Sequence, residues 1–80
     1  MQGELDRITA VICSVGKLTH VEPDADFYEA GLSSINALEL LLELETTFDA
    51  SIPDDEFITA RTPRALATII GRLKEQVQPA

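Results

Sequence analysis

The clearest structural signal in the chain is the stretch SSINALELLLELETTF at residues 33–48. Serine is favoured at a helix N-cap, and the segment from Ile35 to Glu45 consists mostly of strong helix formers. Neither glycine nor proline interrupts the stretch. We therefore expect a helix that begins at the pair Ser33–Ser34 and ends near Phe48.

The segment before this stretch combines a helix with a long loop. Apolar residues recur there at spacings of three and four, which is typical of one helix face, and Gly16 helps to end this helix. These residues are Leu5, Ile8, Ile12 and Val15. Residues 17–31 contain Pro23 and several acidic residues, which predict a loop with space for one helical turn. We expect its aromatic residues, Phe27 and Tyr28, to reach into the core.

The segment after the stretch predicts two more helices. Residues 52–58 read IPDDEFI, a turn followed by a short helix whose acidic first turn complements the helix dipole. Thr62 and Pro63 combine a capping residue with a proline at the first helical position. Apolar residues then follow at helical spacing, namely Leu66, Ile69, Ile70, Leu73 and Val77. Because no stretch alternates like a strand, we expect one all-α domain over residues 1–80, a small four-helix bundle of three longer helices and one short helix.

The charge balance and the cysteine content restrict the function. Fourteen acidic residues against six basic ones give a formal net charge of −8, which disfavours binding to nucleic acid or to a membrane surface. Cys13 is the one cysteine, so an internal disulfide is excluded, and the N-terminus lacks a signal-peptide pattern. The lone His20, the glycines and the carboxylates lack the spacing of a metal site, a phosphate loop or a catalytic pair. We expect a cytoplasmic monomer without an active site of its own.

The predicted helix over residues 33–48 has more apolar surface than one stripe requires. One row on the helical wheel suits the core, and it consists of Ala37, Leu40, Leu41, Leu44 and Phe48. A second row, formed by Ile35, Leu38 and Leu42, lies on a different face. Either neighbouring helices cover both rows, or part of the second row stays exposed between carboxylates as a docking surface. Similarly, Ser33 and Ser34 are either simple caps, or an anionic phosphodiester at Ser34 meets the positive end of the helix dipole.

The run DFYEAGLSSI at residues 26–35 resembles the acyl carrier protein family. In that family an aromatic residue precedes a glycine, and a serine with an aliphatic residue behind it stands three positions after the glycine. Gly31, Ser34 and Ile35 meet this pattern. The resemblance continues through Leu38, Leu40, Leu44, Phe48-Asp49 and the IPDDE turn at residues 52–56, so it covers nearly the whole chain.

The resemblance implies that Ser34 carries covalent 4′-phosphopantetheine, whose thiol holds an acyl or aminoacyl group as a thioester. Around this attachment site it places Gly31, Leu32, Ser33 and Ile35. The implied partners are a phosphopantetheinyl transferase, a loading ligase or acyltransferase, and downstream biosynthetic enzymes. Their expected contacts lie on the helix after Ser34 and on the short helix that follows, namely Ile35, Leu38, Glu39, Leu42, Glu43, Glu45, Phe57 and Ile58.

Two positions depart from the family pattern. Ser33 stands where the motif has aspartate, and Ala30 stands where leucine is usual. We choose Ser34 as the attachment site because its spacing from Gly31 fits, and we expect Ser33 to cap the helix. The missing aspartate favours a discrete carrier of a specialised pathway, aminoacyl or peptidyl, over a housekeeping fatty-acid carrier. Two alternatives remain, a helical adaptor module without a prosthetic group and direct loading of the Cys13 thiol.

Overall fold

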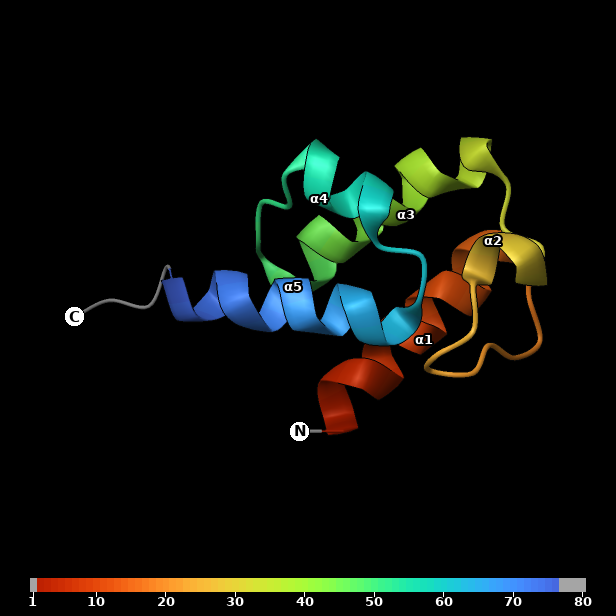
Figure 1. Cartoon of the computed structure of the whole chain (residues 1–80), viewed down its shortest axis with the longest axis horizontal. Helices are drawn as coiled ribbons and strands as arrows, with labels where there is room; N and C mark the ends of the chain where they lie inside the picture. The colour runs from red at the N-terminus through yellow and green to blue at the C-terminus, as the bar shows by residue number, and fades with distance from the viewer. Residues whose placement is uncertain (1, 77–80) are drawn as a thin grey trace.

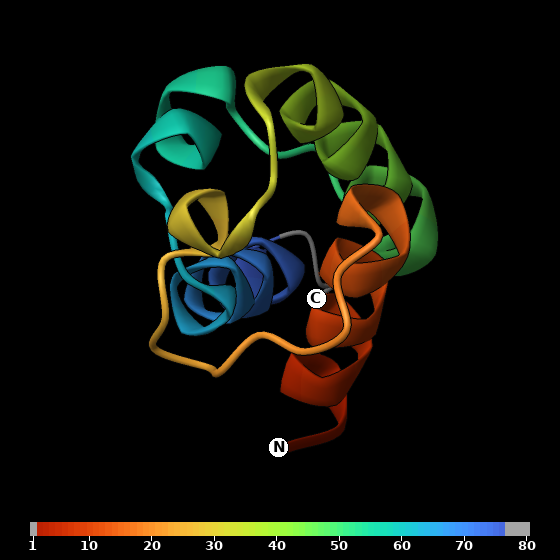
Figure 2. The same ribbon diagram turned by 90° about the vertical axis from the view of Figure 1, so that its right-hand side faces the viewer.

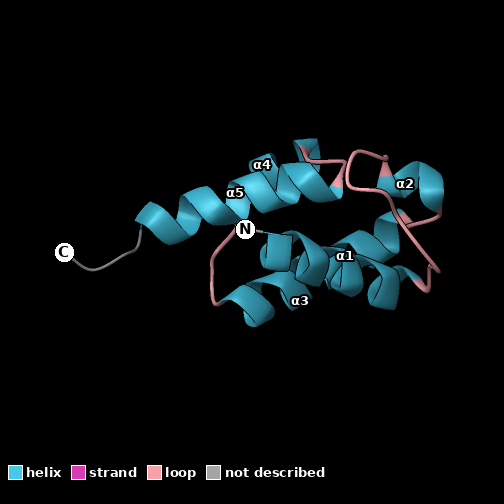
Figure 3. Ribbon diagram, turned by 90° about the horizontal axis from the view of Figure 1, so that it is seen from below, coloured by secondary structure: helices cyan, strands magenta, loops and turns pink. Residues whose placement is uncertain are grey.

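The computed structural model describes residues 2–76, which form helices joined by loops (Figures 1 and 3). In chain order these are α1 (Gln2–Gly16), α2 (Phe27–Ala30), α3 (Ser34–Phe48), α4 (Asp54–Thr59) and α5 (Pro63–Gln76). Within residues 2–76 no strand occurs. The predicted all-α bundle of three long helices and one short helix is confirmed. The additional helix, α2, is the single helical turn that was expected within the loop over residues 17–31.

The three long helices supply most of the core. α1 packs against both α3 and α5, and Figure 2 shows α1 and α3 on one side of the bundle with α4 and α5 on the other. The side chains with no exposed surface confirm the apolar faces predicted for α1, α3 and α5, and they include Ile8, Ile12, Leu40, Leu44, Leu66 and Ile70. Ile69 and Leu73 of α5 are partly buried against this core. Val77, which we assigned to the same face, lies outside the described residues.

The helix ends follow local sequence signals. α1 ends at Gly16 as predicted, and the next residue, Lys17, has a positive φ of 56°. At the start of α5, the Thr62 Oγ1 atom accepts a hydrogen bond of 3.1 Å from the Ala65 amide, which confirms the predicted cap. Because Pro63 has no amide hydrogen, its position as the first helical residue leaves no donor unsatisfied.

The helical turn α2 anchors the long loop in the core. Phe27 is fully buried, as predicted, while Tyr28 is only partly buried beside it with the two ring centroids 4.8 Å apart. α2 ends at Gly31, whose φ of 133° is rarely adopted by residues with a side chain. A Cβ atom there would also lie 2.9 Å from the Leu18 Cδ2 atom. The glycine of the motif is therefore required by the backbone turn that leads into α3.

Candidate functional site

The start of α3 distinguishes two neighbouring serines by their hydrogen bonds. Ser33 is the N-cap, and its Oγ accepts a hydrogen bond of 3.2 Å from the Asn36 amide. The same hydroxyl donates to the Asn36 Oδ1 atom at 2.8 Å. The Ser33 hydroxyl is therefore engaged as donor and acceptor, which confirms its expected role as the cap. Asn36, which completes this reciprocal pair, was not singled out from the sequence, although a polar side chain three residues after a serine cap is a known signature.

Ser34 is the first residue of α3, and its side chain is exposed. Its hydroxyl makes no hydrogen bond with any residue that the structure describes. The first turn of α3 contains no acidic residue, and the first amides of a helix lack intrahelical acceptors. An anionic phosphodiester on Ser34 thus meets the positive end of the helix dipole without a repelling carboxylate in that turn. The residues present fit such a group.

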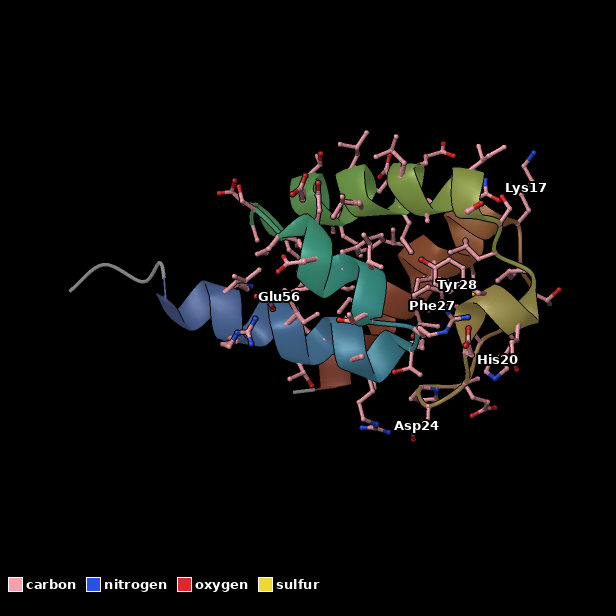
Figure 4. The ribbon with its side chains drawn as sticks, turned by 45° about the horizontal axis from the view of Figure 1, so that its top comes forward. Lys17, His20, Asp24, Phe27, Tyr28 and Glu56 are labelled. Atoms are coloured by element: carbon pink, nitrogen blue, oxygen red, sulfur yellow. The ribbon has the colours of Figure 1, made fainter. Side chains whose placement is uncertain are left out.

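A cation lies on the neighbouring helix end. Lys17, directly after α1, and Asn36 of α3 both line a depression of about 480 Å³ between these helices. Figure 4 shows the Lys17 side chain extending into solvent at the end of α1. Lys17 forms no ion pair with a described residue, although Glu39 and Glu43 line the same depression.

Two residues expected around the attachment site have structural roles in the turn before it. Gly31 forms the turn described above, and its main chain is exposed. The side chain of Leu32 is buried in the core, so only its main chain faces the start of α3 from the surface. Its burial anchors the backbone two residues before Ser34. Ile35, directly behind Ser34, is exposed as expected.

The second apolar row of α3 is exposed. The exposed fraction is 85 % for Ile35, 64 % for Leu38 and 55 % for Leu42, and Ile58 on α4 is 68 % exposed. We call these four residues the α3–α4 face. A shallow groove of about 230 Å³ between the two helices is lined by residues that include Leu38, Phe57 and Ile58. Of the two interpretations of α3, the structure supports the exposed row, because no described helix covers it.

The structure corrects two of the expected partner contacts. Phe57 is only 4 % exposed because it packs from α4 into the core, so it contributes to the floor of the groove and not to the exposed rim. Glu45 is half-buried, and its Oε2 atom accepts a hydrogen bond of 2.9 Å from the Ile52 amide. This carboxylate holds the turn after α3 instead of facing a partner. Glu39 and Glu43 are exposed as expected.

The charges are strongly segregated along the chain. Residues 18–60 contain no lysine or arginine, which is visible in the sequence itself. Arg61, Arg64, Arg72 and Lys74 follow this segment, and each forms an ion pair with a carboxylate. None of the ion pairs within the described part of the chain involves Glu39 or Glu43. Glu39 and Glu43 beside the α3–α4 face are therefore outside the described ion pairs, and Lys17 is the cation that shares a depression with them.

Other kinds of site find no support in the described residues. Cys13 is partly buried against the core, which agrees with a structural thiol. Across residues 2–76 no cluster of three potential metal ligands occurs. None of the helices formed by these residues has the length and apolar character needed to cross a membrane.

Comparison with known proteins agrees with this geometry. The sequence profile of a family described as "Phosphopantetheine attachment site" matches residues 6–70, which include α2, α3 and α4 completely. The chain therefore belongs to the family of phosphopantetheine-binding carrier proteins. It is similar to "Aminoacyl carrier protein 1" of Bradyrhizobium diazoefficiens, with 35 % identity over 60 residues. The aligned segment spans 75 % of this chain and 66 %, slightly under two thirds, of that protein.

Membership of this family establishes the cofactor and the general role. The prosthetic group is covalently attached 4′-phosphopantetheine. The members of this family are carrier domains that tether a substrate on this group.

Proposed function

We propose that Ser34 is the attachment site and that the chain, as one carrier domain over residues 1–80, presents an acyl or aminoacyl thioester to partner enzymes. The observation that carries the proposal is the state of the two hydroxyls at the start of α3. Ser34 is exposed and its hydroxyl is free, whereas the Ser33 hydroxyl is held by Asn36. Both serines are exposed, and of the two only the Ser34 hydroxyl has no hydrogen-bond partner among the described residues.

The residues around Ser34 hold the attachment point in position at the start of α3. When bound, the prosthetic group supplies a thiol that holds the cargo as a thioester. The free amides of the first turn of α3 would stabilise the phosphodiester, and the absence of acidic residues from that turn would avoid repulsion. Tethering then raises the effective concentration of the cargo at a partner's active site.

The α3–α4 face is the proposed docking surface. Its apolar residues Ile35, Leu38, Leu42 and Ile58 lie exposed on the helix that begins at Ser34 and on the neighbouring short helix. Glu39 and Glu43 are exposed without a described cationic partner and would steer basic protein surfaces toward it. We assign this surface to the transferase, to a loading ligase or acyltransferase, and to the downstream enzymes.

We further propose a specialised pathway with an aminoacyl or peptidyl cargo, in preference to housekeeping fatty-acid synthesis. Ser33 replaces the aspartate of the usual motif, so the neighbouring position carries no charge. The similarity to a protein named as an aminoacyl carrier points in the same direction. The net charge of −8 favours a monomer, and the proposed setting is the cytoplasm.

The test is the intact mass of the protein after incubation with coenzyme A and a broad-specificity phosphopantetheinyl transferase. We expect the protein to gain one phosphopantetheine group. The gain should disappear in Ser34→Ala and persist in Ser33→Ala, which is the matched control one residue away. No gain with several transferases would contradict the proposal and favour the adaptor module. A gain that follows Ser33 would show that the wrong serine was assigned.

A further inference from the structure

One carboxylate ties the segment before α3 to the connection between α4 and α5. The Asp26 Oδ1 atom accepts hydrogen bonds from the amides of Tyr28 at 2.8 Å and Glu29 at 3.2 Å, which caps α2. Its Oδ2 atom accepts a hydrogen bond of 2.6 Å from Arg61 Nε. The Arg61 guanidinium carbon also lies 4.8 Å from the centroid of the Tyr28 ring. We call this arrangement of Asp26, Arg61 and Tyr28 the clasp.

On one side the clasp is connected to Ser34 through backbone hydrogen bonds. After α2, the Gly31 amide donates to the Tyr28 carbonyl at 3.2 Å, and the Leu32 amide donates to the Phe27 carbonyl at 3.0 Å. Leu32 is buried, and the next residue is the Ser33 cap. Because each residue between α2 and α3 is fixed by a hydrogen bond or by burial, a movement of α2 is transmitted to the start of α3.

On the other side the clasp fixes the end of α4. Arg61 directly follows Ala60, which is the C-cap of α4 and is buried. The Arg61 carbonyl accepts a hydrogen bond of 2.9 Å from the Phe27 amide, so backbone and side chain both hold this junction. Ile58, the exposed residue of α4, lies three residues before Arg61. The clasp thus connects the two helices that form the α3–α4 face.

We propose that Asp26 and Arg61 are positioning residues, which hold Ser34 and Ile58 in one fixed arrangement so that a partner protein meets a preformed surface. This inference rests on the proposed function of Ser34 and the α3–α4 face. Neither side chain touches the attachment site. Both act through the backbone on each side of the clasp. Preformed binding surfaces bind more tightly because less conformational freedom is lost on association.

A second ion pair in the same loop provides a matched control. Arg64 donates to both carboxylate oxygens of Asp24, at 2.7 and 3.2 Å. This pair also joins the loop to the segment after α4, but it caps no helix, and Asp24 is 74 % exposed where Asp26 is 22 % exposed. Figure 4 shows Asp24 at the outer edge of the loop, away from Phe27 and Tyr28, which point from α2 toward the bundle.

The experiment compares Asp26→Asn and Arg61→Gln with the control variants Asp24→Asn and Arg64→Gln. Asparagine still caps α2 through its side-chain oxygen, so Asp26→Asn removes the ion pair and spares the cap. Two properties are measured in the full chain at a temperature at which circular dichroism shows every variant folded. The first is the set of amide NMR shifts of the unmodified protein, and the second is the KM and kcat of a phosphopantetheinyl transferase for each variant.

We expect Asp26→Asn and Arg61→Gln to shift the amide signals of both Ser34 and Ile58 and to raise KM about three- to fivefold at unchanged kcat. The double variant should be no worse than either single variant, because both remove the same interaction. The two controls should leave these signals and KM unchanged. Equal effects from the controls, or signal changes restricted to α2, would overturn the positioning role. If the wild-type protein gains no prosthetic group while the signals of Ser34 and Ile58 move as expected, the proposed function fails and the positioning role stands.

Discussion

Leu38 and Leu40 stand two residues apart on α3 and provide a matched pair of truncations. Leu38 is 64 % exposed on the α3–α4 face, whereas Leu40 is fully buried in the core. The same change, leucine to alanine, should therefore act on docking at the first position and on folding at the second. We predict that Leu38→Ala leaves the free energy of unfolding nearly unchanged and weakens recognition by partner enzymes.

The size of each effect follows from burial. Complete burial of a leucine side chain is worth about 1.5–3 kcal/mol, and about two thirds of the Leu38 surface is still available to a partner. Loss of that contact should cost about 1–2 kcal/mol of binding free energy, or about 5- to 30-fold in KM. Leu40→Ala should cost about 2–5 kcal/mol of the free energy of unfolding, a large part of the total for a small domain.

Urea denaturation and transferase kinetics with the carrier as the varied substrate measure the two effects. We expect Leu38→Ala to share the denaturation midpoint of the wild type and to show the higher KM. Leu40→Ala should unfold at a lower urea concentration, and its folded fraction should keep the KM of the wild type. If Leu38→Ala destabilises the protein as much as Leu40→Ala, the second row of α3 is not exposed. If KM is unchanged for the transferase and for every loading enzyme, the docking role of Leu38 is wrong.

Three further predictions concern backbone strain, charge and pH. Gly31→Ala should lower the free energy of unfolding by about 1–3 kcal/mol, because a φ of 133° strains any residue that has a side chain. Urea denaturation measures this loss, and an unchanged midpoint would contradict the turn geometry. Charge reversal of Glu39 and Glu43 to lysine should slow loading mainly by lowering the association rate. Added salt should likewise lower the loading rate of the wild-type protein. A loading rate that does not depend on salt would contradict their steering role. Hydrogen bonds from two arginines lower the pKa of Asp24 and Asp26, so both contribute stability that is lost as pH falls through their folded-state pKa. As the pH falls below about 4, the melting temperature of the wild type should therefore decrease, and it should decrease less steeply in the double variant Asp24→Asn/Asp26→Asn. Identical pH profiles of the two proteins would refute this contribution.

The helices of this protein were predictable where the sequence contains local signals. The start of α3 at the serine pair and the start of α5 at Thr62-Pro63 depend on capping, which is decided within four residues. The assignment of Ser34 over Ser33 also came from local spacing. The structure adds a hydrogen-bonding difference between the two hydroxyls that supports the same choice.

The incorrect expectations concern residues whose surroundings are set by distant parts of the chain. Phe57 and Ile58 are neighbours on a six-residue helix, and only the packing of α4 decides that Phe57 is buried and Ile58 exposed. Glu45 looked like a surface charge on α3, but the chain reverses and brings the Ile52 amide to its carboxylate. The bond between Asp26 and Arg61 spans 35 positions, so no local pattern indicates it.

The separation of charges along the chain has a practical consequence for proteolytic mapping. Trypsin cuts after lysine and arginine, so complete digestion between Lys17 and Arg61 leaves residues 18–61 as one fragment. That fragment contains both serines together with α2, α3 and α4. A glutamate-specific protease, which cuts after Glu29 and Glu39, instead releases the ten-residue peptide AGLSSINALE. Fragmentation of this short peptide in a mass spectrometer assigns the modified hydroxyl directly.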